Sequence, residues 1–359
     1  MTGSSTDAVD AALVDFSGAI PQVLHTHSHP FTESLRADII SAQHGTALPT
    51  TAISRLHASI GSVLADAAFR LIDKSQLPTE KIRAIGSHGQ TVCHLPNEKP
   101  PSTMQLGDPA QIVEQTDITT VADFRSRDMA AGGQGAPFAC ALHNAYLRSS
   151  DEDRCVLNLG GIANLTVLPR DNRRPVIGFD SGPANALLDA FIEKHSGQRF
   201  DANGAIAAKG EVHQELLTHY LSDDYFRLPP PKSTGRDYFS DQWMHNQAID
   251  SLSLEDALAT LTELTAVSVA NAVHEHAKNA STLFVCGGGV ANDFLMGRIC
   301  ANLPEVSVQS TSAVGIDPQW MEAVLIAWLA ARVVNGLAGN LPSVTGAEGE
   351  RLCGAIYPA

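Results

Sequence analysis

Residues 155–168 read Cys-Val-Leu-Asn-Leu-Gly-Gly-Ile-Ala-Asn-Leu-Thr-Val-Leu. Two apolar runs, at residues 155–159 and 165–168, flank the pair Gly160-Gly161, so the stretch predicts two strands joined by a glycine turn. Positive φ is common in tight hairpins, and glycine adopts it readily. Asn158, Gly160, Gly161 and Asn164 are therefore candidates for holding a ligand, and a purely structural hairpin is the alternative.

An aspartate follows the next apolar run. Residues 176–179 (Val-Ile-Gly-Phe) predict a strand that ends at Asp180-Ser181-Gly182-Pro183, with a helix expected over residues 185–195. Ligands of open α/β sheets bind at the carboxyl ends of strands, and a helix N-terminus favours phosphate. A carboxylate at Asp180 can act there as a general base. The competing interpretation is an aspartate that only caps the following helix.

A third glycine-rich turn lies later in the chain. A helix is expected over residues 257–277 and a strand over residues 282–286, which runs directly into Gly287-Gly288-Gly289. Consecutive glycines let a flat base or a sugar pack against the backbone. A turn of this kind between a strand and a helix is also common without any ligand.

The beginning of the chain is small and hydroxylated. Residues 3–7 read Gly-Ser-Ser-Thr-Asp and precede a strand expected over residues 9–14. Backbone N–H groups and hydroxyls in such a segment can approach phosphate oxygens closely. The segment is not a P-loop, because no Gly-Lys-Ser/Thr follows. An ordinary flexible terminus is the alternative.

Polar residues follow two further short apolar runs, at residues 82–86 and 118–122. The donors and acceptors of Asp123, Arg125 and Asp128 suit an acidic, polyhydroxylated substrate, and an arginine can pair with a carboxylate in bidentate fashion. His88 and Gln90 lie in a polar loop after a strand, which is typical of functional loops. Solvated turns and a surface ion-pair cluster are the alternatives. The residues are His88 and Gln90 after the first run, and Asp123, Arg125 and Asp128 after the second.

Composition excludes several classes of protein. The 359 residues carry a formal net charge of −15, which disfavours nonspecific binding to nucleic acid or to an anionic membrane. No signal peptide is expected at the start, and the longest apolar run, residues 323–331, is too short to span a bilayer, so we expect a cytoplasmic protein. The scattered cysteines form no Cys-x-x-Cys pair, so we expect buried thiols and no metal site or redox pair: Cys93, Cys140, Cys155, Cys286, Cys300 and Cys353.

The length predicts two domains, and the alternation of strands with helices predicts an α/β fold with a largely parallel or mixed sheet in each half. A long helix is expected from about Thr51 to Asp73, where apolar residues recur at helical spacing. The Gly-rich residues 127–137 are interpreted as a loop that crosses between domains.

Taken together, three glycine-rich turns and an aspartate after a strand are typical of the actin-like ATPase fold. The chain resembles the anhydro-N-acetylmuramic acid kinase family over essentially its whole length. The matching stretches are Ser-His-Gly-Gln-Thr-Val, Gln-Leu-Gly-Asp-Pro-Ala, Val-Ala-Asp-Phe-Arg, Gly-Gly-Gln-Gly-Ala-Pro, Asn-Leu-Gly-Gly-Ile-Ala-Asn-Leu-Thr, Gly-Phe-Asp-Ser-Gly-Pro-Ala-Asn, Pro-Pro-Lys-Ser-Thr-Gly-Arg, Val-Cys-Gly-Gly-Gly and Gly-Asn-Leu-Pro-Ser-Val-Thr-Gly-Ala.

The resemblance implies a two-domain actin-like fold with an interdomain cleft. Domain I is then expected at residues 1–128 plus about 340–359, and domain II at residues 129–339. The implied reaction converts 1,6-anhydro-N-acetylmuramic acid, ATP and water into N-acetylmuramic acid 6-phosphate and ADP, a step of peptidoglycan recycling. ATP would be used as its Mg²⁺ complex, and family members commonly pair as dimers.

The resemblance also implies roles for individual residues. Asp180 matches the catalytic base that activates water, and Gly287, Gly288 and Gly289 match the adenosine turn. Asn158, Gly160, Gly161 and Asn164 match the second phosphate hairpin. The first phosphate segment comprises Gly3, Ser4, Ser5, Thr6, Asp7, Ala8, Val9 and Asp10. The sugar-binding set comprises His88, Gln90, Asp123, Arg125, Asp128 and Glu322, the last near the implied dimer interface.

Three departures from the family pattern give further expectations. Ala8 stands where the family has glycine, so it can oppose a positive φ, and Val290-Ala291-Asn292 replaces Ala-His-Asn. The family also has an apolar strand ahead of the first phosphate segment, and Met1 matches its last residue. We therefore expect either a start further upstream or a form that is unstable and binds ATP weakly. A kinase for another aminosugar and a catalytically weak nucleotide-binding regulator are the alternative functions.

Overall fold

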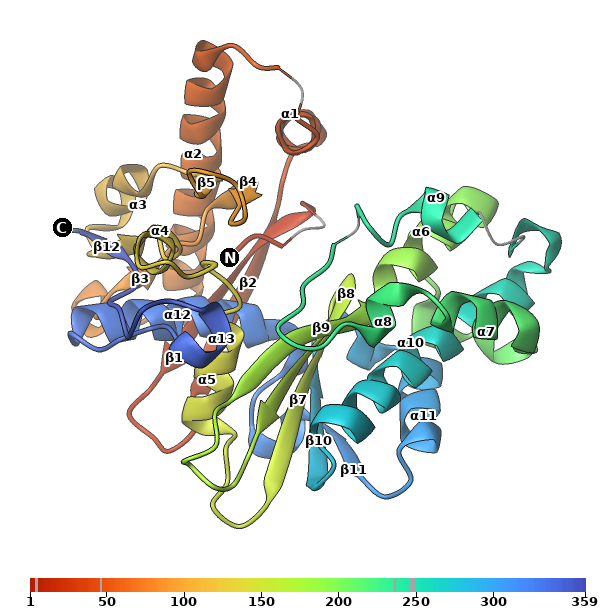
Figure 1. Cartoon of the computed structure of the whole chain (residues 1–359). Helices are drawn as coiled ribbons and strands as arrows, with labels where there is room; N and C mark the ends of the chain where they lie inside the picture. Colours follow the sequence, from red (N-terminus) through yellow and green to blue (C-terminus); the bar gives the residue numbers. More distant parts are fainter. Residues whose placement is uncertain (4–5, 46, 236, 246–248) are drawn as a thin grey trace. The chain divides into compact units, whose positions relative to one another are not determined.

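The chain divides into two compact units (Figure 1). The computed structural model describes residues 1–3, 6–45, 47–235, 237–245 and 249–359. Unit 1 comprises Met1–Leu142 and Trp320–Ala359, and unit 2 comprises His143–Gln319. The chain thus leaves unit 1 later, and returns to it earlier, than the expected boundaries near residues 128 and 340.

Two features keep the additional residues in unit 1. Helix α12 (Met321–Val334) packs on strands β1 (Ala8–Asp15), β3 (Ile85–Gly86) and β6 (Thr120–Ala122) of that unit. The Gly-rich residues 127–137, expected as a crossing loop, also lie within unit 1 and include part of α4 (Ser126–Ala130). The division falls instead inside α5 (Ala139–Tyr146).

Unit 2 is built on a five-stranded mixed sheet of order β11-β10-β7-β8-β9. The strands β11, β10 and β7 are parallel, whereas β8 runs antiparallel to both of its neighbours. This matches the expected hairpin, because β7 and β8 are consecutive and joined by the glycine pair. Their bounds are β7 Asp153–Leu159, β8 Ile162–Leu168, β9 Ile177–Pro183, β10 Ala280–Cys286 and β11 Ser307–Ser310.

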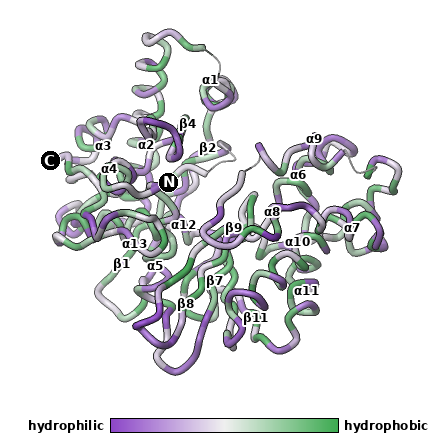
Figure 2. The backbone as a smooth tube through the Cα atoms, in the orientation of Figure 1, coloured by the Kyte–Doolittle hydropathy of each residue, from purple (hydrophilic) through white to green (hydrophobic). Residues whose placement is uncertain are grey.

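The helices of unit 2 bury the apolar side chains of this sheet. The long helix α10 starts at an N-cap, Ser253, whose side chain accepts from the Asp256 N–H. Its residues Ala266 to Val273 join the core formed with β7–β10, and Figure 2 shows the strands as largely hydrophobic. The helices are α6 Asn185–Ser196, α7 Gln214–Leu221, α8 Asp224–Arg227, α9 Asp241–His245, α10 Leu254–His276 and α11 Asp293–Asn302.

The described residues of unit 1 contain three separate groups of strands. Strands β1 and β2 form an antiparallel pair, β4 and β5 form another, and β12, β6 and β3 form a three-stranded sheet. In that sheet β3 is parallel and β12 antiparallel to β6. The bounds not yet given are β2 Gln22–Pro30, β4 Gln90–Leu95, β5 Ser102–Leu106 and β12 Ala355–Tyr357.

Helix α2 carries much of the core of unit 1. The expected helix is present as Thr50–Ser75, and Leu56, Ile60 and Leu64 bury their side chains against Val9 and Ile112. The remaining helices are α1 Glu33–Gln43, α3 Pro109–Thr116 and α13 Pro342–Thr345. No helix within the described ranges is long and apolar enough to cross a membrane.

Candidate functional site

The glycine turn between β7 and β8 is fixed to the start of α6. Asn185 donates from Nδ2 to the carbonyl of Gly160 at 2.8 Å, and its backbone N–H reaches the same carbonyl at 3.1 Å. The Ala184 and Ala186 N–H groups both donate to the Gly161 carbonyl at 3.0 Å. Neither glycine of the turn has a left-handed φ, so the expected positive φ is wrong. The hydrogen bonds to the N-terminus of α6 hold the turn without a positive φ.

Asp180 lies inside strand β9 and does not end it. The strand runs on to Pro183 because Ala163 and Ile162 of β8 continue to pair with Gly182 and Pro183. The helix-cap alternative also fails, because the N-cap of α6 is Ala184. The predicted strand end is therefore wrong, although the predicted helix begins at residue 185 as expected.

Both carboxylate oxygens of Asp180 accept a hydrogen bond within unit 2. Asn164, on the neighbouring strand β8, donates from Nδ2 to Oδ1 at 2.8 Å, and the Thr234 N–H donates to Oδ2 at 2.9 Å. Burial raises the pKa of Asp180, while these two bonds and the Lys232 charge oppose the rise. The result is a half-buried, oriented carboxylate with increased basicity, which suits a general base.

The Pro-rich segment that follows α8 holds Asp180 from the other side. Asp180 donates its backbone N–H to the Lys232 carbonyl at 3.0 Å, and the Tyr225 hydroxyl donates to the Asp180 carbonyl at 2.8 Å. Lys232 in turn places its Nζ 4.7 Å from the centre of the Tyr225 ring. The sequence assigned no role to Lys232 or Thr234. Lys232 and Thr234 bind Asp180 through backbone groups, so the identity of their side chains does not predict these contacts.

The glycine turn Gly287-Gly288-Gly289, called here the second glycine turn, has one open and two crowded positions. Gly287 has φ +87°, and a Cβ there would lie 2.8 Å from the Leu159 carbonyl oxygen. A Cβ on Gly289 would lie 2.6 Å from the Leu159 Cβ, whereas no described atom lies within 4 Å of one on Gly288. Gly287 and Gly289 thus let the turn pack on β7. Only Gly288 offers backbone to a flat ligand. Asn292, the last residue of the stretch Val290-Ala291-Asn292 that differs from the family pattern, is the N-cap of α11.

In unit 1, the first phosphate segment forms a turn closed by backbone bonds. Met1 and Asp10 exchange two backbone hydrogen bonds of 2.8 Å, and the Thr6 N–H donates to the Gly3 carbonyl at 3.3 Å. The left-handed φ of this turn falls on Thr6, at +53°, while Ala8 starts strand β1. The expected conflict at Ala8 is therefore absent. Ser4 and Ser5, two of the expected ligands, lie outside the described residues.

A hydrogen-bond chain joins the two polar loops of unit 1. His88 Nδ1 lies 3.0 Å from the Gly89 carbonyl, so it donates there and leaves Nε2 to accept from Arg125 Nε at 3.1 Å. Arg125 Nη1 also donates to the Gly135 carbonyl at 3.1 Å. Burial and the Arg125 charge lower the pKa of His88 to about 3, so the ring stays neutral. His88 therefore orients the guanidinium.

Glu322 interacts electrostatically with both Arg125 and the carboxylate of Asp10. Glu322, at the start of α12, is exposed, yet desolvation and the Asp10 charge raise its pKa, while the Met1 amine and Arg125 lower it. Thr2 links the first phosphate segment to the same region, because its hydroxyl donates to the Gly89 carbonyl at 2.8 Å. Sequence reasoning missed Thr2, since nothing in its residue type distinguishes it from a surface threonine.

The other expected sugar-binding residues differ in accessibility. Asp128 is 0% exposed, and it accepts from Thr345 Oγ1 at 2.8 Å, Asn340 Nδ2 at 2.7 Å and the Gly135 N–H at 2.8 Å. It therefore ties the Gly-rich loop to the C-terminal segment. Asp123 is exposed and accepts from Ser126. Gln90 is 2% exposed, and its Oε1 has no partner among the described residues.

The expected residues thus gather in two clusters. Unit 2 brings together the hairpin turn, Asp180 and the second glycine turn, and unit 1 brings together the first phosphate segment, His88, Arg125 and Glu322. No group of three His, Cys, Asp or Glu side chains in the described part of the chain can hold a metal ion. Among the cysteines, the expectation of burial is wrong for Cys93, which is half-buried, and for Cys300, which is exposed.

Similarity to known proteins identifies the family of this chain. A family model described as "Anhydro-N-acetylmuramic acid kinase" matches residues 1–359. Relatives of that name from Xanthomonas campestris and Coxiella burnetii are 50% and 44% identical, cover 100% and 99% of this chain, and are each matched over 96% of their own length. Solved structures include an activator of 2-hydroxyisocaproyl-CoA dehydratase from Clostridium difficile (12% identity, 85% and 86% of the two chains, TM-score 0.41). A ROK hexokinase from Thermus thermophilus is also similar (12% identity, 90% and 100% of the two chains, TM-score 0.33). Both TM-scores are too low to support a fold assignment. The chain belongs to the anhydro-N-acetylmuramic acid kinase family, and it is an ATP-using kinase with a mixed α/β architecture.

Proposed function

We propose that Asp180 is the general base of this kinase and activates the water that opens the anhydro bridge of its sugar. The observation that carries the proposal is the hydrogen-bonding of both Asp180 oxygens, by Asn164 and by the Thr234 N–H, in a setting where burial raises the pKa. A carboxylate with raised pKa is a better proton acceptor, and its orientation is fixed before the substrate arrives.

The proposed reaction balances without any further reactant. The oxygen of water bonds to C1 of the sugar, and Asp180 accepts a proton from that water. The bond between C1 and O6 breaks, so O6 becomes the nucleophile that takes the γ-phosphoryl group of ATP as ADP leaves. Asp180 then releases its proton to solvent.

The nucleotide contacts are assigned by the backbone that each segment offers. Phosphate oxygens would meet the N–H groups of residues 3–10 and of the turn at Gly160-Gly161, and adenosine would lie over Gly288. Small residues in these segments let phosphate approach the backbone closely. Mg²⁺ would accompany the phosphates and neutralise charge that develops on the transferred group.

The acidic sugar would be recognised in unit 1. Arg125, oriented by His88 and the Gly135 carbonyl, is suited to a substrate carboxylate. Glu322, Asp123 and Gln90 would take its hydroxyl and amide groups. The fully buried Asp128 would act on this site only by shaping the Gly-rich loop.

We also propose that the enzyme works in the cytoplasm, where ATP is supplied, and that it pairs as a homodimer. Light scattering across a range of concentrations tests the dimer. A kinase for another aminosugar is the second candidate function. A competition assay with a non-anhydro aminosugar separates the two.

Replacement of Asp180 tests the proposal. Asp180→Asn keeps the shape but cannot accept a proton, so sugar phosphorylation should fall about 10²–10⁴-fold or more. ATP affinity should stay within a few-fold, measured by calorimetry. Asp171→Asn, at a half-buried aspartate outside the site, is the matched control. Near-normal turnover by Asp180→Asn would overturn the proposed role.

A further inference from the structure

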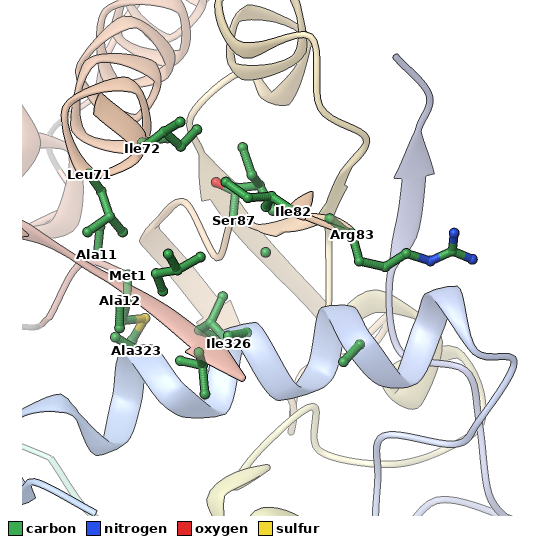
Figure 3. A pocket seen from close by; sticks show the side chains of 18 of the residues that line it. Met1, Ala11, Ala12, Leu71, Ile72, Ile82, Arg83, Ser87, Ala323 and Ile326 are labelled. Atoms are coloured by element: carbon green, nitrogen blue, oxygen red, sulfur yellow. The ribbon is translucent and has the colours of Figure 1, made fainter. Parts of the chain in front are cut away.

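A cavity of about 550 Å³ in unit 2 lies beside the strand that carries Asp180. Phe179 and Ser181, the neighbours of Asp180 on β9, border it, and so do Phe226 and Lys232. The cavity of about 580 Å³ in unit 1 differs, because the side chains labelled around it in Figure 3 are mostly apolar. The chain between Phe226 and Lys232 thus has open space beside it instead of packed side chains, so hydrogen bonds must fix its position.

Residues 225–234, called here the Asp180-binding segment, make three hydrogen bonds to Asp180. The Tyr225 hydroxyl donates to the Asp180 carbonyl, and the Lys232 carbonyl accepts from the Asp180 N–H. The Thr234 N–H donates to the carboxylate itself, at Oδ2. Whatever holds the two ends of this segment therefore determines how the carboxylate is hydrogen-bonded.

Asp223 joins the chain on both sides of the segment. Its Oδ1 accepts from the Tyr225 N–H and from the Tyr238 hydroxyl, both at 2.8 Å. Its Oδ2 accepts from Trp243 Nε1 at 2.9 Å. Tyr225 begins the segment, whereas Tyr238 and Trp243 follow it in the chain. We call Asp223, Tyr238 and Trp243 the carboxylate latch.

Aromatic packing supports the latch. The ring of Phe239, which is 1% exposed, lies edge-on to the rings of Tyr225 and Trp243, with centroids 5.3 Å and 5.0 Å away. Tyr220, which is 0% exposed, stacks on Trp243 with centroids 4.9 Å apart. These contacts keep the indole of Trp243 where its N–H reaches Asp223.

A helix cap is the competing interpretation of Asp223. Its side chain is the N-cap of α8 through the bond from the Tyr225 N–H. Capping needs only one acceptor at this position, and a serine supplies it equally well. The bonds from Tyr238 and Trp243 take no part in capping, and they are the bonds that join the two sides of the segment.

Asp223 also stays charged where Asp180 titrates. Burial raises the pKa of Asp223, but the bonds from Trp243, Tyr225 and Tyr238 outweigh it and bring the pKa below its usual range. The pKa of Asp180 is instead raised by burial. As pH falls, Asp180 therefore takes up its proton first, while the latch is still closed.

We propose that Asp223 is a positioning residue for Asp180: with Tyr238 and Trp243 it holds residues 225–234 so that the Thr234 N–H binds the carboxylate. The proposal rests on the proposed role of Asp180 as general base. Asp223 would act only through the segment, because its bonds are made to Tyr225, Tyr238 and Trp243.

Two variants separate the latch from the cap. Asp223→Ser keeps an acceptor for the Tyr225 N–H, but its short side chain cannot reach Tyr238 and Trp243. Tyr238→Phe combined with Trp243→Phe keeps Asp223 and its cap, and removes both latch bonds. Asp224→Asn is the matched control, because the Asp224 side chain is 95% exposed and pairs with Arg227 at 3.1 Å.

The first readout is the pH profile of sugar phosphorylation. Both latch variants should move the acid limb of kcat/KM for the sugar upward by about one pH unit, because a backbone N–H bond to a carboxylate lowers its pKa by about that much. The value of kcat should fall about tenfold or more, and KM for ATP should stay within about twofold, since the latch lies outside the segments assigned to the nucleotide. The charged and titratable groups near Asp180 are unchanged in both variants: Lys232, Tyr225, and Glu275 of α10, which faces Lys232.

The second readout is hydrogen exchange, measured by mass spectrometry without ATP or sugar. The Thr234 and Asp180 amides donate in opposite directions across the same contact. Both should exchange about tenfold faster in the latch variants, whereas the amides of the β7–β8 ladder should not change. Exchange at Thr234 and Asp180 that equals the exchange in Asp224→Asn would overturn the proposal.

The kinetic result separates this proposal from the one on which it rests. If Asn164→Ala moves the acid limb and neither latch variant does, Asp180 is the base but does not need the latch, and the positioning role of Asp223 is refuted. If the limb stays in place in Asn164→Ala as well, the general-base role of Asp180 itself is refuted. The two failures are therefore distinguishable.

Discussion

Asn164→Ala removes one of the two hydrogen bonds to the Asp180 carboxylate, and it should shift the pH dependence of the reaction. The lost bond joins Asn164 Nδ2 to Asp180 Oδ1 at 2.8 Å, and it stabilises the charged form. A hydrogen bond to a charged group contributes about 1.5–3 kcal/mol, which corresponds to about one to two pKa units. The pKa of Asp180, already raised by burial, should therefore rise further.

The sign follows from the role of the base. Asp180 must be unprotonated to accept a proton, so the rate falls as pH drops through its pKa. A higher pKa makes that fall begin at higher pH, and the acid limb of kcat/KM for the sugar should move upward by about one to two units. The assay is initial-rate ADP release at saturating ATP between pH 4 and pH 9.

Asn158→Ala provides the matched control. Asn158 lies directly opposite Asn164 in the same hairpin, and its side chain is directed at the second glycine turn. Its loss should change KM for ATP and leave the acid limb in place. An unmoved acid limb in Asn164→Ala, with a folded protein and a measurable rate, would show that the limb does not report Asp180 and would refute the reasoning.

Three further predictions concern other parts of the molecule. Gly288→Ala should weaken ATP binding about tenfold or more with little change in Tm. Gly287→Ala should lower Tm, because its Cβ would lie 2.8 Å from the Leu159 carbonyl oxygen and its φ is +87°. Thermal shift and calorimetry separate the two effects, and equal effects of both variants would contradict the assignment. Asp128→Ala should destabilise unit 1 by about 3–5 kcal/mol, since three donors lose a buried acceptor, and urea unfolding measures it. Burial lowers the pKa of His143 to about 3, so the unfolded chain takes up a proton that the folded chain does not as pH falls below about 6.5. Stability of unit 2 should fall by about 1.4 kcal/mol per pH unit between about pH 6 and pH 3, and His143→Gln should flatten that slope; an unchanged slope would be evidence against a buried neutral ring.

Local pattern was sufficient for the main elements of the fold. The periodic apolar residues of α2 and the apolar runs around Gly160-Gly161 each predicted an element that is present. The predicted end of the strand at Phe179 was wrong, because pairing with β8 carries β9 on to Pro183. Pairing of this kind depends on tertiary contacts and has no signature in the residues themselves.

The chemistry of the site was predictable to a smaller extent. Asp180 was a candidate because it follows an apolar run and precedes an expected helix, which is where ligands of open α/β sheets bind. Its partners were not, since Thr234 acts through its backbone N–H and Lys232 through its carbonyl. Asp128 has the same residue type as its exposed neighbour Asp123, yet only the structure reveals that Asp128 is fully buried.

The central claim is that a single reaction opens the anhydro bridge with water and phosphorylates O6. The most direct test incubates the protein with ATP and 1,6-anhydro-N-acetylmuramic acid in ¹⁸O-labelled water and analyses the product by mass spectrometry. We expect N-acetylmuramic acid 6-phosphate with one labelled oxygen at C1 and none in the phosphate, and Asp180→Asn should give no product. Label in free phosphate, without a phosphorylated sugar, would mean that the protein only hydrolyses ATP and would contradict the account.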